Sequence, residues 1–152
     1  MVGCGIYTTK EHHFILTTHQ SVFGFGVADE PFFKAEIDAD GEEIGCLILQ
    51  SLAGSQTGVE TTGRLKDLGK KMIDFVGYRT AKAFEKASIY INVSADEEQV
   101  TLTPSVTAGK SGGFLLKPDS SLHCSLAVQE VGQTFLKLLD ERKRLLTDQA
   151  NP

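Results

Sequence analysis

The sequence predicts a single α+β domain in which a largely antiparallel β-sheet is covered by several helices. The expected elements run as strands, helices, a hairpin and a final helix, without the strict β-α-β-α alternation of a doubly wound parallel sheet. A chain of 152 residues favours one domain with a substantial core. An apolar content of 41% with 23% charged residues is ordinary for a soluble globular protein. We expect the domain to span residues 1–147, followed by a disordered tail over 148–152.

The first 37 residues are rich in β-branched and aromatic side chains, which is typical of strands. Polar or proline-containing breaks divide them into four stretches: GIYTT, HFILTTH, SVFGFGV and PFFKAEI. Two or three antiparallel strands are the simplest arrangement for this part of the chain.

A helix is expected to follow, with Asp40 as its N-cap and Glu43 at the capping-box spacing. Its apolar residues recur at helical intervals and are Ile44, Leu47, Ile48 and Leu52. Gly54 is the natural end, and the polar residues 55–63 predict an exposed loop.

Leu68, Met72 and either Phe75 or Val76 lie on one side of a second predicted helix. Gly77 ends or kinks it before a third helical stretch over 78–87. The last predicted helix runs from about 127 to 146 with one apolar stripe.

Between these helices, residues 88–93 and 99–106 flank the acidic turn SADEE and predict a β-hairpin. Because Pro104 has no N–H for a ladder, the second strand is expected either to end there or to turn that end to an edge. The stretches FLLKP and SSLHCSL predict two further short strands.

Three helical segments share an acid, an aliphatic residue and then a glycine: EEIG, KDLG and QEVG, which end at Gly45, Gly69 and Gly132. Glycine within a helix costs about 1 kcal/mol relative to alanine. We expect the missing Cβ to let these helices lie close to the sheet or to each other, so Gly45 and Gly132 are predicted to be structural. The copy at Gly69 can equally be coincidental.

The net charge of -5 argues against direct nucleic-acid binding and suits a basic protein partner. No apolar run approaches the ~20 residues of a membrane span, and no secretory signal is visible, so the predicted location is cytoplasmic. Cys4, Cys46 and Cys124 form no C-x-x-C pair and are expected to be reduced and buried.

No catalytic or cofactor signature emerges, so the sequence predicts no enzyme and no cofactor. GKSGG matches a nucleophile elbow around Ser111, but no helix is expected after it. His12 and His13 should point to opposite faces of a strand, and no metal-ligand spacing joins them to His19 or His123. The alternative is a small enzyme whose site is assembled from His12, His19, His123 and Ser111. A regulatory oligomerisation module is a third reading.

Several segments in order resemble one known family. DADGEEIGCLILQSLAGS is followed by GYRTAKAFEKASIYINVSADEEQVTLTPSV, then by GGFLLKPDSSLHCS and EVGQTFLKLLDE. This arrangement resembles the CdiI-type immunity proteins of bacterial contact-dependent growth inhibition, and the resemblance covers most of the chain.

The resemblance implies a cytoplasmic protein, not an enzyme, that binds the C-terminal toxin domain of a large secreted protein, commonly a nuclease. Some relatives accept a strand or hairpin of the toxin onto their sheet, which is β-augmentation. Binding residues do not transfer by motif, so the predicted hairpin and its acidic turn are nominated from this sequence alone, against the simpler reading of a solvated hairpin tip. The nominated residues are Ile89, Ile91, Val93, Asp96, Glu97, Glu98, Thr101 and Thr103.

Overall fold

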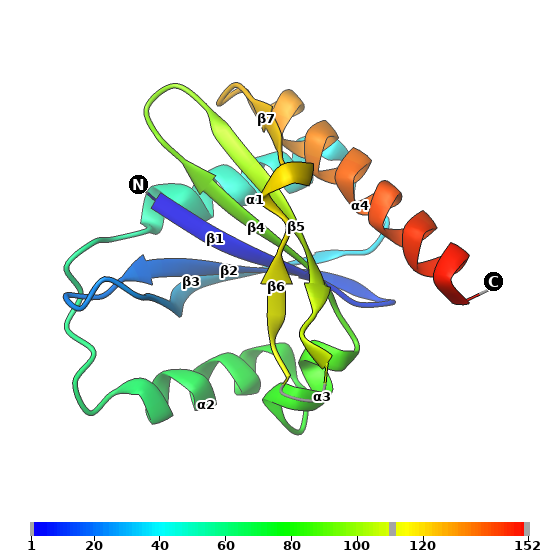
Figure 1. The fold of residues 1–152 in the computed structure, drawn as a ribbon. Coiled ribbons are helices and arrows are strands. Elements are labelled where there is room, and N and C mark those ends of the chain that lie inside the picture. The colour runs from blue at the N-terminus through cyan, green and yellow to red at the C-terminus, as the bar shows by residue number, and fades with distance from the viewer. Residues whose placement is uncertain (1, 110–111, 151–152) are drawn as a thin grey trace.

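The structure is a computed structural model that describes residues 2–109 and 112–150. Its sheet consists of β1 (Val2–Thr8), β2 (His12–Gln20), β3 (Gly26–Glu36), β4 (Ile89–Ala95), β5 (Val100–Thr107), β6 (Phe114–Leu116) and β7 (Leu122–Cys124). The spatial order is β3-β2-β1-β4-β5-β6, with β7 also beside β5, and each pair is antiparallel. The α+β fold class and the single domain are confirmed (Figure 1).

Four α-helices in the described residues cover the sheet from two sides: α1 (Gly41–Gly54), α2 (Leu65–Val76), α3 (Ala81–Lys86) and α4 (Val128–Ala150). The larger core lies between the sheet and the pair α1 and α4, where Ile6, Ile91 and Phe135 are fully buried. A smaller core on the opposite face joins Phe14 of β2 to α2 and to Phe84 of α3. Successive side chains of a strand point to opposite faces of the sheet. Alternate residues of the same strand therefore belong to different cores.

The N-terminal part contains three strands, which is one of the two arrangements expected. However, residues 21–27 do not form a strand of their own, because residues 21–25 turn between β2 and β3. The predicted break at 29–31 lies inside β3, where the register shifts opposite Thr17. The Thr17 hydroxyl donates to the Pro31 carbonyl at 2.6 Å. An irregularity of this kind lets an edge strand accept a proline.

The predicted limits of α1 are confirmed, since Asp40 caps the helix by accepting the Glu43 N–H at 2.9 Å and the helix ends at Gly54. Gly77 ends α2 in a left-handed conformation with φ 77°. Helix α3 is shorter than the predicted 78–87. Helix α4 continues past the expected end near 146, so residues 148–150 of the predicted tail belong to it, and residues 151–152 lie outside the described part.

The predicted hairpin is formed by β4 and β5, but Pro104 does not end its strand. Pro104 lies opposite Ile91 in the last pair between these strands, and β5 continues to Thr107 beside β6. The missing N–H is tolerated because the Ser105 hydroxyl donates to the Tyr90 carbonyl at 2.7 Å just beyond it. The Pro104 carbonyl itself accepts the Lys117 N–H at 2.8 Å. The two short strands expected after the hairpin are β6 and β7.

Candidate functional site: the open face and edges of the sheet

The nominated hairpin has no open edge for an incoming strand. Strand β4 lies between β1 and β5, while β5 is flanked by β7 along 100–102 and by β6 along 105–107. Ile91 and Val93 are fully buried against α1 and α4, and Ile89 packs at the margin of the same core. Ile91 and Val93 therefore hold the core together, and a partner reaches them only if a neighbouring element is displaced, whereas Ile89 is partly exposed.

The nominated threonines point to the other face of the sheet. Thr103 is buried, and its hydroxyl bonds the Ser121 hydroxyl at 2.8 Å. Thr101 is partly exposed and bonds the His123 ring at 3.0 Å. Both side chains thus fasten the β7 region to β5, and only Thr101 keeps some exposure to solvent.

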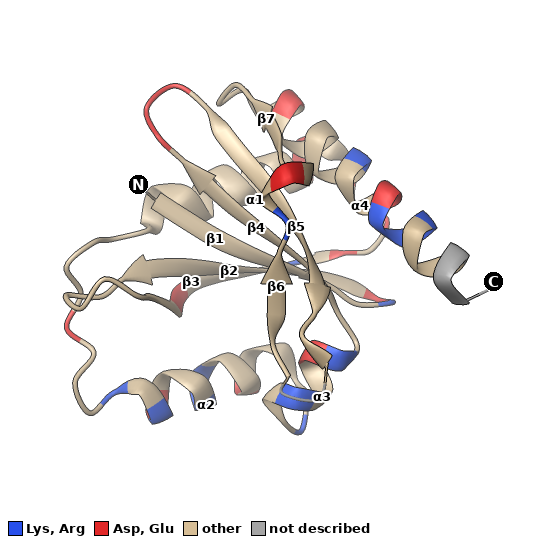
Figure 2. Cartoon of the chain, viewed as in Figure 1, with Lys and Arg blue, Asp and Glu red and all other residues tan. Residues whose placement is uncertain are grey.

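The acidic turn divides into one structural residue and two outward-facing ones. The Asp96 carboxylate accepts the backbone N–H groups of Glu98 at 2.8 Å and Gln99 at 2.9 Å. These backbone hydrogen bonds lower the pKa of Asp96 because they favour its charged form. Glu97 and Glu98 are exposed at the end of the hairpin, which appears red in Figure 2. Their carboxylates are the part of the turn that a partner can contact.

A second hairpin tip, over residues 21–25, displays apolar side chains that the sequence reading had placed in a strand. Phe23 is 67% exposed and Phe25 is 42% exposed. Their rings stack with centroids 6.3 Å apart and planes 8° apart. Gly24 between them has φ 89°, a left-handed conformation that glycine adopts readily. A glycine at this position is therefore the feature of the sequence that indicates a turn. We call residues 22–25 the aromatic tip.

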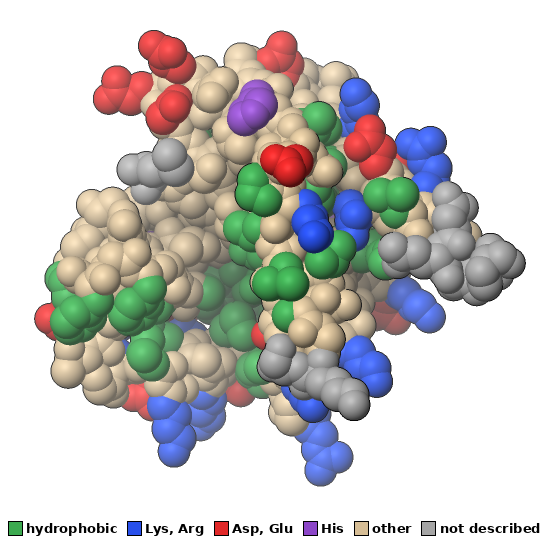
Figure 3. Space-filling view, viewed as in Figure 1, with side chains coloured by type: hydrophobic (Ala, Val, Ile, Leu, Met, Phe, Trp, Pro, Cys, Tyr) green, Lys and Arg blue, Asp and Glu red, His purple; other side chains and the backbone are tan. Residues whose placement is uncertain are grey.

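Two of the outer edges of the sheet, β3 and β6, differ in chemistry. Strand β3 carries Pro31 and several charged residues, which are features that protect edge strands from pairing. Strand β6 is uncharged and apolar, and Leu115 and Leu116 are 55% and 43% exposed. Figure 3 shows hydrophobic side chains gathered over β6 and, across a hollow, near the aromatic tip. Of these two edges, β6 is therefore the unprotected one, while the third edge strand, β7, lies against α4.

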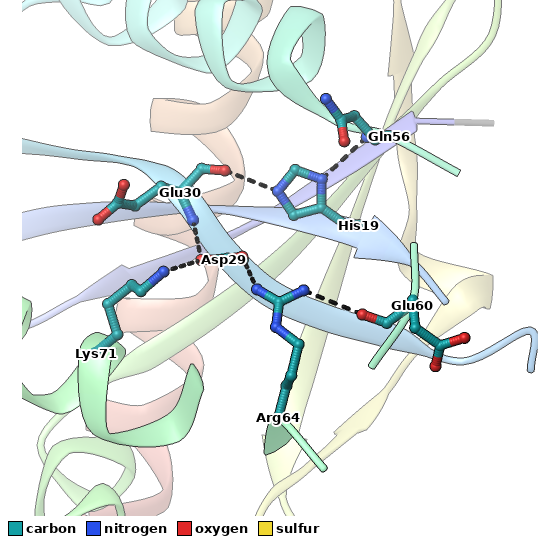
Figure 4. A network of polar contacts seen from close by, with 7 residues as sticks. All are labelled: His19, Asp29, Glu30, Gln56, Glu60, Arg64 and Lys71. Atoms are coloured by element: carbon teal, nitrogen blue, oxygen red, sulfur yellow. Dashed lines mark hydrogen bonds and ion pairs between the residues drawn. The ribbon is translucent and has the colours of Figure 1, made fainter. Parts of the chain in front are cut away.

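A polar network holds the loop after α1 and the start of α2 against β3 (Figure 4). Asp29 accepts a hydrogen bond from Lys71 at 2.9 Å and lies 3.7 Å from the Arg64 guanidinium. Arg64 also donates to the Glu60 carbonyl at 3.0 Å. Burial opposes ionisation of Asp29, but the Lys71 and Glu30 N–H hydrogen bonds and the Lys71 charge outweigh it and lower the pKa of Asp29. The charged groups of this network are paired with one another, so the network has a structural role in holding α2 against β3.

The histidines of the enzyme alternative do not converge. His12 and His19 lie at opposite ends of β2, and His123 lies on β7, which is separated from β2 by β1, β4 and β5. Ser111 lies outside the described residues. His19 is buried, donates to the Glu30 carbonyl at 2.8 Å and accepts the Gln56 N–H at 3.1 Å. Residues 2–109 and 112–150 hold no group of three metal-ligating side chains.

The cysteines are free but only one is fully buried. Burial raises the pKa of Cys4 to about 12, whereas Cys124 is partly buried and Cys46 is exposed on α1. The expectation of burial is thus wrong for Cys46. Its position four residues after Glu42 in a helix whose other face enters the core places it on the solvent side.

No helix in the described part of the chain is both long enough and apolar enough to cross a membrane. No protein-family model matches the sequence, and no curated protein does.

Two solved structures share the fold. A protein of unknown function, NMB0488, from Neisseria meningitidis has a TM-score of 0.74 and 23% identity over 93% of this chain and 94% of that chain. A chain of the CdiA-CT/CdiI toxin and immunity complex from Yersinia pseudotuberculosis has a TM-score of 0.67 and 14% identity over 88% of this chain and 92% of that chain. At these identities the likeness is one of fold, and the fold is CdiI-like.

Proposed function

We propose that this protein is an immunity protein that binds and neutralises the C-terminal toxin domain of a contact-dependent growth inhibition protein. Two independent observations support the proposal: the family resemblance of the sequence, and the fold shared with a chain of a toxin and immunity complex. The protein would act by stoichiometric binding in the cytoplasm of the producing cell and not by catalysis. Its net charge of -5 suits a basic nuclease domain.

The observation that carries the proposed binding mode is the apolar, unprotected edge of β6. A toxin strand that pairs antiparallel with residues 114–116 would gain backbone hydrogen bonds at the edge and cover Leu115 and Leu116, which solvent now reaches. Edge strands of this character are templates for pairing with another chain. Because β4 lies between β1 and β5, and β5 is already flanked by β4, β7 and β6, we assign β-augmentation to β6 instead of the nominated hairpin.

The proposal predicts that a large secreted protein is encoded beside this chain, and the C-terminal domain of that protein provides the test. Co-expression should yield an equimolar complex, and cells that make the domain without this chain should stop growing. If the purified proteins do not associate, or if the domain is harmless without this chain, the proposed function is wrong.

The binding mode has its own test in the substitutions Leu115→Lys and Leu116→Lys. A charge on the apolar edge should weaken the complex at least about tenfold, which is about 1.4 kcal/mol. Leu145→Lys is the matched control, because Leu145 is similarly exposed but lies on α4. If both edge variants bind the toxin domain with wild-type affinity, β6 is not part of the interface. That result would not contradict the proposed immunity function.

A further inference from the structure

The aromatic tip and the acidic turn lie at the same end of the sheet, on either side of the start of β1. Gly3 of β1 pairs with Thr18 of β2 on one side and with Ser94 of β4 on the other. Strand β2 runs from Thr18 into the aromatic tip, and β4 runs from Ser94 into the acidic turn. The two tips thus flank the start of β1 (Figure 1), and we call them the two walls.

Between the walls lies a depression of about 230 Å³ that is lined by small and polar residues together with Val2 and Val93. Gly3 and Gly26 place no side chain on this floor, and the space beside them is tight: a Cβ on Gly3 would meet the Val93 carbonyl oxygen at 3.1 Å, and one on Gly26 would meet the Thr18 methyl at 2.9 Å. Asn92 and Ser94 supply polar groups to the same floor. The floor therefore offers hydrogen-bonding groups to a backbone that approaches closely.

Backbone hydrogen bonds fix the conformation of the aromatic tip, although its side chains are exposed to solvent. The Ser21 N–H donates to the Phe25 carbonyl at 2.9 Å, and the Gly24 N–H donates to the Ser21 carbonyl at 3.0 Å. The loop between α1 and α2 supports the tip as well. The Val22 N–H donates to the Val59 carbonyl at 2.9 Å, and Ser21 pairs with Val59 in a parallel bridge. Two stacked phenylalanines fixed in water are the type of rigid aromatic anchor found at the centre of interfaces.

The opposite wall has the complementary character, because Glu97 and Glu98 extend from a turn that Asp96 has already fixed through its own hydrogen bonds. An occupant of the depression that extends beyond Ser94 would reach these carboxylates, and one that extends beyond Gly24 would reach the stacked aromatic rings. A Lys or Arg side chain suits both walls, since it pairs with carboxylates and its stem or guanidinium packs on aromatic faces. Phosphate groups, and hence nucleic acid or anionic lipid, are repelled by the acidic wall.

We infer that the two tips form a docking site for an extended segment of the toxin domain that carries a basic residue towards one end and an apolar or aromatic residue towards the other. This inference rests on the proposed function and adds a second contact, away from the β6 edge. The apolar contact supplies affinity, and the charged contact speeds encounter and selects the cognate toxin.

The experiment measures binding of the same purified toxin domain to variants of each wall. Phe23→Ser with Phe25→Ser should weaken binding about 10- to 100-fold. Glu97→Lys with Glu98→Lys should slow association and weaken binding at least about tenfold in about 0.1 M salt, and the loss should shrink in about 1 M salt, where charges are screened beyond about 3 Å. Because all four side chains are exposed, the melting temperatures should stay close to that of the wild type.

Matched controls separate the walls from general surface effects. Leu145→Ser with Leu146→Ser removes similarly exposed apolar side chains from α4. Glu11→Lys with Asp140→Lys makes the same change in net charge at two other exposed positions. Both controls should bind like the wild type.

Each outcome has one meaning. If the wild type binds but both tip variants bind equally well, the docking site is wrong and the immunity function stands; if the wild type does not bind, both fall. If the loss in Glu97→Lys with Glu98→Lys is the same at both salt concentrations, the electrostatic wall is wrong. If the chain alone is a dimer by light scattering and Phe23→Ser with Phe25→Ser makes it monomeric, the occupant is a second copy and the inference is overturned.

Discussion

Gly132 of α4 lies against Gly41 of α1 so closely that a Cβ on Gly132 would be 1.7 Å from the Gly41 carbonyl oxygen. One turn away, a Cβ on Gly45 would be 2.1 Å from the Val128 carbonyl oxygen. Real Cβ atoms essentially never come within 3.0 Å of such an atom, and a backbone carbonyl cannot swing aside as a side chain can. Gly45 and Gly132 therefore allow the backbones of α1 and α4 to lie this close where the two helices cross on one face of the sheet.

Replacing Gly132 with Ala should destabilise the protein even though alanine is the better helix former. The clash forces α1 and α4 apart and disturbs the larger core, which costs about 1–3 kcal/mol. Urea unfolding measures this change, and the larger Gly45→Leu should also lower the melting temperature. The matched control is Gly69→Ala, because no atom lies within 4 Å of a Cβ there, and it should stabilise by up to about 1 kcal/mol. Equal effects at Gly69 and Gly132 would contradict the close-packing explanation.

The buried imidazole of His13 should make the protein less stable in mild acid. Burial is the main cause that lowers the pKa of His13 from 6.5, the charges of Lys143 and His12 add to it, and the hydrogen bond to the Ile37 carbonyl opposes it. Below pH 6.5 the unfolded chain takes up a proton on this residue before the folded chain does. The free energy of unfolding should therefore decrease as the pH falls from 6.5 towards the lower folded pKa.

Denaturant unfolding from about pH 8 to about pH 5 measures this dependence in the wild type and in His13→Gln. The slope should be smaller in His13→Gln, whereas His123→Gln, at an exposed position on β7, should keep the wild-type slope. An NMR titration in which the His13 ring titrates at or above 6.5 would show that burial does not govern its protonation.

Loss of the Asp29 carboxylate should loosen α2 and the loop behind the aromatic tip. Asp29→Asn removes the charge that pairs with Lys71 and Arg64. Partly exposed pairs of this kind contribute about 0.2–1 kcal/mol each. The unfolding free energy should drop by about 1 kcal/mol, and amide exchange should speed up at Val59, whose N–H donates to the Gln20 carbonyl. Asp67→Asn, on the exposed side of α2, is the control, and unchanged exchange in Asp29→Asn would contradict the role of the network.

The three thiols should react in an order that follows their exposure. A thiol reagent added to the native protein should modify Cys46 first, because it is exposed, and Cys124 more slowly. Cys4 should stay unmodified until the protein unfolds, since burial raises its pKa to about 12 and excludes the reagent. Mass spectrometry of the digested protein identifies the labelled site. Early labelling of Cys4 would mean that the core around β1 opens under native conditions.

Local patterns of the sequence determined most of the elements. Asp40 and Gly54 marked the limits of α1 because capping depends on neighbouring residues. The strand-like runs 88–93 and 99–106 on either side of the acidic turn predicted the hairpin of β4 and β5. The strand expected over 21–27 and the break expected at 29–31 were wrong, because a turn and an irregularity within a strand have similar compositions and only pairing with β2 distinguishes them.

The candidate site depended on information that the sequence does not contain. Local sequence indicated that residues 88–93 form a strand, but whether an edge is open is decided by which strands pair, and those pairings join residues as distant as Gly3 and Ser94. The sequence by itself thus determined the α+β class, the helix caps and the glycines of the α1–α4 crossing. Only the tertiary structure decided that β4 is internal, that β6 is the unprotected edge, and that an aromatic tip stands across β1 from an acidic turn. The physical reason is that capping and periodicity act within a few residues, whereas strand order and burial result from packing the whole chain at once.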